Sequence, residues 1–451
     1  MSLEVRGRQV VVIGLGASGL AAARVLLDEG ASVRVTEARP RAEVDAAAAE
    51  AEAAGAEVLA GGHRPDHLDG AALVVTSPGV PEHAEVIHEA RARGLPVWSE
   101  LELGARLAIA PYVAVTGTNG KTTTTEMVAE AMRRAGLDAI ACGNIGHPFS
   151  LAAAEGHQAL AVEASSFQLR FHETFHPRVS VLLNLAPDHL DWHRTLEDYR
   201  ESKRRIYALQ GDGDTHVGNL EDPHAAEVSR EAPCPVAWFR LGEPGAGQVG
   251  YEGGTLVARL DGRRELGVPS AATSSLRADA AAAAAAGISF GLDPAAVGAA
   301  VTSVGPLPHR GTVVAEVNGV RFVDDSKASN PHAALAAIDG LQDAVLVAGG
   351  RSKGVDLSPL AVAIPSLAGV VAIGEAAAEL VALFEGRVPV RTAGSMEEAV
   401  AEAMAMAVPG SAVVLAPACA SWDMFRDYRD RGERFAAAAR ALAERAEVPG
   451  A

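Results

Sequence analysis

Cysteine is scarce in this chain of 451 residues, which has only Cys142, Cys234 and Cys419. The three lie far apart and form no C-x-x-C pair, which argues for reduced thiols and against a disulfide framework or a zinc site. Basic residues are also outnumbered, because 39 Lys and Arg stand against 57 Asp and Glu, for a net charge of −18. This balance disfavours non-specific binding of nucleic acid.

Long apolar runs are missing as well. No window approaches the roughly 20 residues needed to cross a bilayer, and the first residues lack a charged-then-apolar signal segment. We therefore expect a cytoplasmic protein without membrane insertion. Aromatic residues make up 4% of the chain, whereas Ala and Gly are abundant, as in many α/β enzymes. Ala-rich stretches such as 45–54 favour helices with small contact faces.

Residues 1–99 are predicted to form a Rossmann-like domain. Apolar strands alternate with helical patterns and are expected at Gln9–Ile13, Ser32–Thr36 and Leu73–Thr76. The first strand leads into the glycine turn Gly14–Gly19, and the second ends at Glu37. This is a βαβ unit of the dinucleotide-binding kind, which taken alone would indicate an NAD-binding domain.

Residues 100–306 are predicted to form a central domain with a parallel sheet like that of P-loop ATPases. Its strands are expected at Tyr112–Thr116, Ala159–Glu163 and Val179–Leu185. A hairpin-like stretch at 247–267 and an alanine helix at 278–286, running to Gly287, follow them. The linker to the next domain is expected at residues 305–308, which read Gly-Pro-Leu-Pro.

Residues 307–451 are predicted to form a second Rossmann-like domain, which opens with a hairpin around Asn318-Gly319. Parallel strands are expected at Ala344–Ala348, Val370–Ile373, Val388–Thr392 and Ala412–Ala416, with helices such as 395–407 and 433–446 between them. The fold class is therefore α/β, with three domains in series.

A glycine-rich turn follows the strand Tyr112–Thr116 and reads Gly117-Thr118-Asn119-Gly120-Lys121-Thr122, with a helical pattern from Thr123. Backbone amides, a lysine and a hydroxyl at a helix N-terminus are suited to hold a polyphosphate and its magnesium. We expect Lys121 to reach the β- and γ-phosphates and Thr122 to place its hydroxyl on Mg²⁺. The loop is one residue tighter than G-x-x-x-x-G-K-[ST], because Val115 stands at the position of the first glycine.

Further polar residues follow other strands, where ligands of open parallel sheets bind. Glu163 ends a buried apolar strand and needs a cation, for which the Mg²⁺ on Thr122 is the expected partner. The run that begins there reads Glu-Ala-Ser-Ser-Phe-Gln-Leu. Asn184 opens an Asn-x-x-x-Asp-His-x-Asp pattern that contains His189, and the basic helical stretch 199–207 contains Lys203.

These motifs together resemble the Mur ligase family, whose folyl-polyglutamate synthetase relatives share the short ATP loop. The run from Glu163 is similar to the signature of the D-glutamate-adding members, with Ala164 where leucine is usual. The resemblance implies that residues 117–123 bind ATP and that His189 helps to bind a second Mg²⁺ and the substrate. It also implies that Lys203 reacts with CO₂ to form a carbamate, which would be a ligand of that second ion.

The last domain carries further motifs of this resemblance. They are Leu-Pro-His-Arg ending at Arg310, Asp-Ser-Lys-Ala-Ser-Asn from Asp325, and the stretches 349–356 and 416–425. By the resemblance Arg310 and Asp325 belong to the ATP site, and Arg310 or Lys327 would offset charge on the γ-phosphate as it transfers. The residues implied to meet the carboxylates of the incoming glutamate are Ser329, Lys353, Ser421 and Tyr428, the last through its backbone. Cys419 is expected to be a packing residue.

The N-terminal glycine motif is the weak one, because no set of residues for hydride transfer follows it. In Mur ligases the same fold binds the uridine diphosphate of a nucleotide-linked muropeptide. The residues implied to line this site are Ala17, Ser18, Ala38, Arg39 and Gly79, with Asn144 nearer the reaction centre. One stretch departs from the family, because Ser274–Asp279 lacks the usual His-Asn pair. Asp279 stands in for a second asparagine and would accept from the adenine amino group.

The resemblance covers nearly the whole chain and implies an ATP-dependent ligase of peptidoglycan precursor synthesis. It would join D-glutamate to UDP-N-acetylmuramoyl-L-alanine through an acyl phosphate, with two Mg²⁺ ions. We expect a monomer whose partners are these small molecules. Three alternatives remain: another Mur-type or folyl-polyglutamate ligase, a nicotinamide oxidoreductase, and a catalytically silent nucleotide-binding module.

Overall fold

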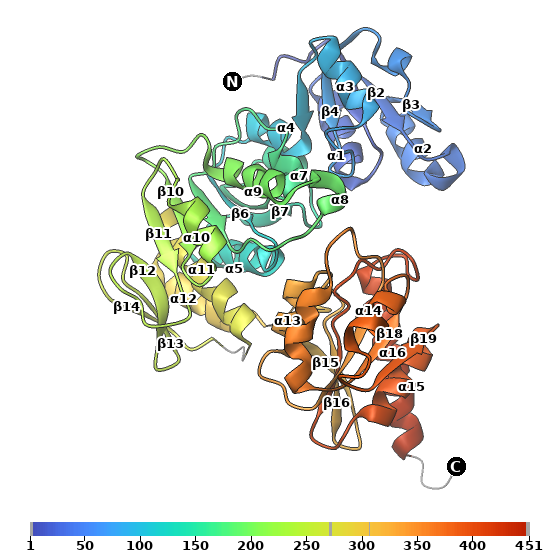
Figure 1. Cartoon of the computed structure of the whole chain (residues 1–451). Coiled ribbons are helices and arrows are strands. Elements are labelled where there is room, and N and C mark those ends of the chain that lie inside the picture. Colours follow the sequence, from blue (N-terminus) through green and yellow to red (C-terminus); the bar gives the residue numbers. More distant parts are fainter. Residues whose placement is uncertain (1–2, 270–272, 306, 448–451) are drawn as a thin grey trace. The chain divides into compact units, whose positions relative to one another are not determined.

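The computed structural model describes residues 3–269, 273–305 and 307–447 and forms two compact units (Figure 1). The first unit comprises Met1–Leu185 and Glu197–Val304, and the second comprises Ala186–Leu196 and Gly305–Ala451. Pro306 of the expected linker lies outside the described residues. The predicted boundaries between three domains stay a prediction.

The first sheet of unit 1 is parallel and has the strand order β3-β2-β1-β4-β5. Its elements are β1 (Gln9–Ile13), α1 (Ala17–Asp28), β2 (Ser32–Glu37), α2 (Asp45–Ala53), β3 (Glu57–Ala60), β4 (Ala71–Thr76), α3 (Glu85–Ala92) and β5 (Val97–Ser99). The predicted strands and the glycine turn between β1 and α1 are confirmed. The short strands β3 and β5 were not expected from the sequence.

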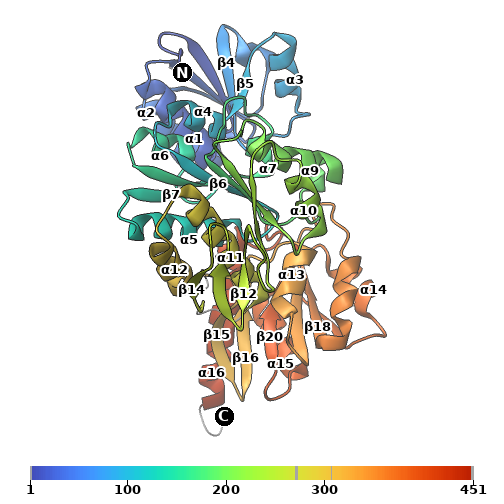
Figure 2. The same ribbon diagram turned by 90° about the vertical axis from the view of Figure 1, so that its left-hand side faces the viewer.

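The second sheet of unit 1 has the order β14-β13-β12-β11-β10-β9-β6-β8-β7. Its strands are β6 (Tyr112–Thr116), β7 (Ala139–Gly143), β8 (Ala159–Glu163), β9 (Val179–Leu182), β10 (Thr215–Asn219), β11 (Val236–Phe239), β12 (Gln248–Glu252), β13 (Thr255–Ala258) and β14 (Arg264–Gly267). Neighbouring strands are parallel from β7 at one edge of the sheet as far as β12. Strands β12, β13 and β14 pair antiparallel and form the predicted hairpin-like stretch. Figure 2 shows this stretch beside α12.

Helices accompany this second sheet. They are α4 (Glu100–Leu107), α5 (Lys121–Arg134), α6 (Phe149–Ala154), α7 (Ser166–Leu169), α9 (Leu196–Arg204), α10 (Pro223–Ser229), α11 (Ser274–Phe290) and α12 (Pro294–Ser303). The alanine helix α11 packs against α5 and α12, and the small side chains Ala280–Ala286 are fully buried there. Small contact faces let helices approach closely, so the alanine run builds core.

The C-terminal ends predicted for two elements of unit 1, β9 and α11, differ from the structure for physical reasons. Strand β9 stops at Leu182; the Leu183 amide still donates to the carbonyl of Thr116, the last residue of β6, and Asn184 then bonds the loop after β6. Helix α11 continues through Gly287 to Phe290 and is capped by Gly291. A Cβ at Gly287 would lie 2.9 Å from a methyl of Val297 on α12, so this glycine serves packing and does not stop the helix.

Unit 2 contains a sheet of order β15-β16-β20-β17-β18-β19. Its elements are α8 (Leu190–His193), β15 (Thr312–Val317), β16 (Val320–Asp324), α13 (Pro331–Ile338), β17 (Ala344–Gly349), β18 (Leu367–Ile373), α14 (Ala377–Phe384), β19 (Val390–Ala393), α15 (Met396–Met406), β20 (Ala412–Leu415) and α16 (Tyr428–Glu447). The hairpin β15–β16 is antiparallel and the other pairs are parallel, which confirms the predicted α/β class.

Candidate active site

The glycine-rich loop lies between β6 and α5, as predicted, and Asn184 braces it. The Thr118 amide donates to the Asn184 carbonyl at 3.1 Å, and the Asn119 amide donates to the Asn184 side-chain oxygen at 2.8 Å. The Asn184 amide group in turn donates to the Asn119 carbonyl at 3.1 Å. Gly117 and Gly120 have φ values of 154° and 84°, which side-chain-bearing residues rarely adopt. These hydrogen bonds and backbone angles fix the shape of the loop.

Two lysines meet at this loop. Lys121 donates to the carbonyls of Gly117 and Thr118 at 2.9 and 2.8 Å, and Lys203 from α9 donates to the same Gly117 carbonyl at 2.7 Å. Lys203 is only 1% exposed, and its ammonium lies 4.6 Å from the centre of the Tyr199 ring. The structure thus brings Lys203, 82 positions after Lys121 in the sequence, to the phosphate loop.

Tyr199 is a residue of this site that sequence reasoning missed. It stands one helical turn before Lys203 on α9, and its hydroxyl lies 3.0 Å from the hydroxyl of Thr118. Residues four apart share a face of a helix, so this spacing was the available signal. Tyr199 and Lys203 together fix α9 against the loop.

Glu163 ends β8 beside Thr122, as predicted. The Thr122 hydroxyl donates to one carboxylate oxygen at 2.8 Å, and the side-chain amide of Asn144 donates to the other at 2.9 Å. Glu163 is 2% exposed. Asn144 therefore orients this carboxylate, in addition to the substrate contact predicted for it.

This pair fits magnesium. Mg²⁺ takes oxygen ligands and is commonly held by one or two protein groups together with substrate phosphates and water. The Thr122 hydroxyl and the Glu163 carboxylate offer such ligands next to the phosphate loop. Within residues 3–269, 273–305 and 307–447, no group of three or more His, Cys, Asp and Glu side chains is arranged to hold a metal ion.

The run after Glu163 has a local structural task. Ser165 caps α7, accepting from the Gln168 amide at 3.3 Å, while the Gln168 side chain accepts from the Ser165 amide at 3.0 Å. This reciprocal capping box fixes the turn that follows β8. It therefore holds Glu163 at the end of its strand.

Asp279 near the start of α11 is placed against the phosphate loop. A Cβ at Gly120 would lie 2.2 Å from a carboxylate oxygen of Asp279, and Asp279 is 8% exposed. The residue predicted to contact adenine thus belongs to the surroundings of the loop, and the contact with the base stays a prediction.

In the first sheet, Glu37 at the end of β2 serves its own neighbours. It accepts from the Leu15 amide at 2.7 Å and from the Arg39 amide and side chain at 3.0 Å. Burial of the carboxylate raises its pKa, but the hydrogen bonds from Arg39 and Leu15 outweigh this and lower the pKa to about 2. In dinucleotide-binding domains the acidic residue at this place binds a ribose hydroxyl. Here it orders the turn that contains the predicted residues Ala38 and Arg39.

The turn from β1 to α1 is tight. A Cβ at Gly19 would lie 2.0 Å from the Gly14 carbonyl, and Gly14 has a φ of 92°. The Ser77 hydroxyl, from the loop after β4, donates to the Gly14 carbonyl at 3.2 Å. This brings the loop that contains Gly79 beside the turn that contains Ala17 and Ser18, as a shared nucleotide site requires.

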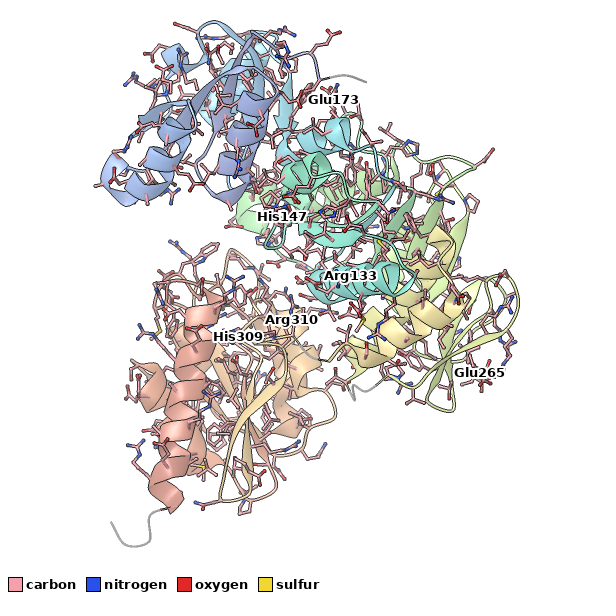
Figure 3. The ribbon with its side chains drawn as sticks, turned by 180° about the vertical axis from the view of Figure 1, so that it is seen from behind. Arg133, His147, Glu173, Glu265, His309 and Arg310 are labelled. Atoms are coloured by element: carbon pink, nitrogen blue, oxygen red, sulfur yellow. The ribbon has the colours of Figure 1, made fainter. Side chains whose placement is uncertain are left out.

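Unit 2 holds the remaining predicted residues. His309 has a φ of 62°, its Nδ1 lies 2.7 Å from the Asp324 carboxylate, and its carbonyl accepts from the Lys327 amide at 3.2 Å. Figure 3 shows the side chains of His309 and its neighbour Arg310 in this unit. Burial raises the pKa of Asp325 to about 7; the Arg310 charge acts against this rise and the Asp324 charge adds to it.

Lys353, expected to meet a substrate carboxylate, already binds a carboxylate of this chain. Its ammonium lies 2.6 Å from one oxygen of Asp188, and the Asn330 side chain donates to the other at 3.2 Å. The side chains of Lys353 and Asp188 are 5% and 6% exposed. Asp188 and His189 belong to Ala186–Leu196, which pack with unit 2. A metal site that joins His189 to Glu163 therefore stays a prediction.

The loops of the predicted glutamate site are tied to one another. Residues Arg351 and Ala420 form a bridge, and the Ala418 amide donates to the Ala328 carbonyl at 2.8 Å. Arg431 on α16 is buried and donates to the carbonyls of Ser326 and Cys419. These contacts join the segments that carry the predicted residues, namely Ser329, Lys353, Ser421 and Tyr428.

Tyr428 and Lys327 also contact each other, with the ammonium of Lys327 3.8 Å from the centre of the Tyr428 ring.

Cys419 is buried, and burial raises the pKa of its thiol to about 12, which agrees with a packing residue. All three cysteines are free and buried. No helix in the described ranges is both long and apolar enough to span a bilayer.

Three family models match the chain in series. The Mur ligase MurD-like N-terminal domain matches residues 8–99, the Mur ligase middle domain residues 115–248, and the Mur ligase glutamate ligase domain residues 309–419.

Curated relatives agree over nearly the full length. A UDP-N-acetylmuramoylalanine–D-glutamate ligase of Frankia casuarinae is 43% identical, with 98% of this chain and 95% of the relative covered. One of Streptomyces coelicolor is 41% identical, with 98% and 100% covered.

Solved structures share the fold. The UDP-N-acetylmuramate-alanine ligase MurC from Thermotoga maritima has a TM-score of 0.60 and 18% identity, covering 97% of this chain and 98% of that one. The MurF ligase from the same organism, in complex with ADP, has a TM-score of 0.60 and 18% identity, covering 98% and 96%.

Proposed function

Because this chain belongs to the Mur ligase family, we propose that it joins D-glutamate to UDP-N-acetylmuramoyl-L-alanine at the expense of ATP. The relatives from Frankia casuarinae and Streptomyces coelicolor, which are 43% and 41% identical, both carry the name of this ligase, which favours it over a sister ligase or a folyl-polyglutamate synthetase. The observation that carries the chemistry is the meeting of Lys121 and Lys203 at one carbonyl of the phosphate loop.

The reaction has to activate a carboxylate, because a carboxylate is a poor acyl donor. The γ-phosphoryl group of ATP passes to the L-alanyl carboxylate, which gives an acyl phosphate and ADP. The amine of D-glutamate attacks the acyl carbon, and the tetrahedral intermediate expels phosphate as the peptide bond forms. Phosphoryl transfer and the expulsion of phosphate both develop negative charge at the phosphoryl group, so the protein must supply cations there.

The chain's own groups fit this task. Lys121, which donates to the Gly117 and Thr118 carbonyls of the loop, would turn to the β- and γ-phosphates of bound ATP. Thr122 and Glu163 would hold magnesium, which when bound would neutralise charge on the transferring group. Lys203, as a carbamate, would offer anionic oxygens for a second ion. Arg310 and Lys327 would add fixed positive charge from unit 2.

The proposal places the other residues at the two substrates. Ala17, Ser18, Ala38, Arg39 and Gly79 would line the uridine diphosphate, with Asn144 and His189 nearer the acyl group. Ser329, Lys353, Ser421 and Tyr428 would hold D-glutamate, and Asp279, Arg310 and Asp325 would complete the ATP site. We also propose a cytoplasmic monomer; three free cysteines are in keeping with a reducing compartment.

A nicotinamide oxidoreductase is disfavoured by Glu37. The carboxylate that would bind a ribose hydroxyl of NAD accepts three hydrogen-bonding groups of Leu15 and Arg39. The fully formed ATP loop has no use in hydride transfer.

The direct test is phosphate release with ATP, Mg²⁺ and UDP-N-acetylmuramoyl-L-alanine, with D- or L-glutamate added. We expect release with the D-enantiomer only. No release with either enantiomer defeats the assignment, and release with L-glutamate alone keeps the chemistry but changes the substrate. Lys121→Ala should abolish release, whereas a silent binding module predicts a change of stability only.

A further inference from the structure

The N-terminal sheet indicates where a nucleobase would lie. In this kind of fold the diphosphate binds at the turn after β1 and the ribose beside the end of β2. Because the strands lie in the order β3-β2-β1, a nucleotide that runs from the end of β1 past the end of β2 reaches the carboxyl end of β3 next. The loop after β3 is joined to the predicted site, because the Gly61 amide donates to the Arg39 carbonyl at 2.9 Å. The base of a bound uridine diphosphate would therefore meet this loop.

Two histidines of this region share one hydroxyl. The Thr36 hydroxyl, at the end of β2, lies 3.0 Å from Nδ1 of His63 and 2.7 Å from Nδ1 of His67. Thr36 is fully buried, His67 is 2% exposed, and His63 is half-buried in the loop after β3. Burial lowers the pKa of both imidazoles, so each ring is neutral near pH 7 and carries one proton.

The buried end of His67 decides where these protons are. Its Nε2 is buried and has no hydrogen-bond partner among the described residues. A buried N–H without an acceptor is rarer in proteins than a bare acceptor, so the proton of His67 belongs on Nδ1. His67 then donates to the Thr36 oxygen, and the single hydroxyl proton of Thr36 is donated to Nδ1 of His63. His63 must consequently carry its own proton on Nε2, the outer nitrogen.

We propose that the chain of hydrogen bonds from His67 through Thr36 to His63 fixes His63 Nε2–H as a donor to a carbonyl oxygen of the uracil base. Uracil presents two carbonyl oxygens, which accept hydrogen bonds, so an N–H donor held in place complements the edge of the base. An imidazole that exchanged between its two tautomers would offer this donor only part of the time. The inference rests on the proposed function, because that function supplies a uridine nucleotide as the ligand. It makes His63 a specificity-determining residue for the base.

The test measures binding of UDP by calorimetry, which needs no turnover. His63→Leu should weaken UDP about three- to tenfold, the range expected for one neutral hydrogen bond. His63→Gln, which keeps an N–H donor, should recover part of this loss. His88→Leu replaces an exposed histidine on α3 of the same sheet and is the matched control, expected to bind UDP like the unchanged protein.

Two analogues locate the contact. In one, sulfur replaces the O2 oxygen of the base, and in the other it replaces O4; sulfur is the weaker acceptor. The unchanged protein should lose affinity for one analogue, and His63→Leu should show no such loss. Nitrogen-15 NMR of the ring nitrogens gives a reading independent of ligand, with His63 protonated on Nε2 and His67 on Nδ1.

The outcomes separate the two proposals. Equal UDP binding by His63→Leu and the unchanged protein, or an equal sulfur penalty in both, overturns the role of His63 while D-glutamate ligation stands. Protonation of His63 on Nδ1 overturns it as well. Failure of the unchanged protein to bind UDP overturns this inference, whereas the proposed function is decided by phosphate release with D-glutamate.

Discussion

Glu37 gives a stability prediction that can be worked out from the structure. Its side chain is 6% exposed, and its pKa falls from 4.5 to about 2. A carboxyl whose pKa is lower in the folded state stabilises the fold above its unfolded pKa and loses this stabilisation as pH falls toward the folded pKa. The difference corresponds to about 3 kcal/mol in full, of which about 2 kcal/mol would be lost between pH 6 and pH 3. Since Arg39 is 50% exposed, screening makes this an upper value.

The assay is urea unfolding of the unchanged protein and of Glu37→Gln at pH 6 and pH 3. Trp98 on β5 of the same sheet reports by fluorescence. The free energy of unfolding should fall by up to about 2 kcal/mol more in the unchanged protein than in Glu37→Gln. Glu57→Gln, which removes an exposed carboxylate of β3, is the control and should follow the unchanged protein. Parallel pH dependence in Glu37→Gln and the unchanged protein would refute the reasoning.

Three further predictions concern single positions. Lys203→Ala should lose activity and regain part of it with added short carboxylic acids, whose oxygens would replace those of the Lys203 carbamate. Full activity of Lys203→Ala without added acid would contradict the carbamate role. Asp188→Asn should lower the KM for D-glutamate at least about threefold, because the carboxylate 2.6 Å from the Lys353 ammonium loses its negative charge. Initial rates that give an unchanged or higher KM would contradict this competition. Gly19→Ala should cost about 1–3 kcal/mol in denaturant unfolding, since its Cβ would lie 2.0 Å from the Gly14 carbonyl, and an unchanged midpoint would contradict this clash.

The sequence predicted the parts of the site that are local. The phosphate loop, the carboxylate at the end of β8 and the turn after β1 each follow from an apolar strand and the polar residues directly behind it. Lys203 was added by resemblance, and the structure brings it to the carbonyl of Gly117.

Other features depend on contacts between distant segments, which spacing does not reveal. The pair Asp188–Lys353 and the brace that Asn184 gives to the phosphate loop are of this kind. Helix α16 begins at Tyr428, five residues before the predicted start, although Gly432 is a poor helix former. Arg431 in that first turn is buried and hydrogen-bonded to two loops, so tertiary contacts override local propensity there.

The central claim is that the L-alanyl carboxylate is phosphorylated before the amine attacks. It is tested most directly by following oxygen-18 from the carboxylate of UDP-N-acetylmuramoyl-L-alanine during turnover with ATP and D-glutamate. If the carboxylate is phosphorylated, one labelled oxygen appears in the released phosphate and the other stays in the new peptide carbonyl. Unlabelled phosphate, with the second labelled oxygen released as water when the peptide bond forms, would contradict it.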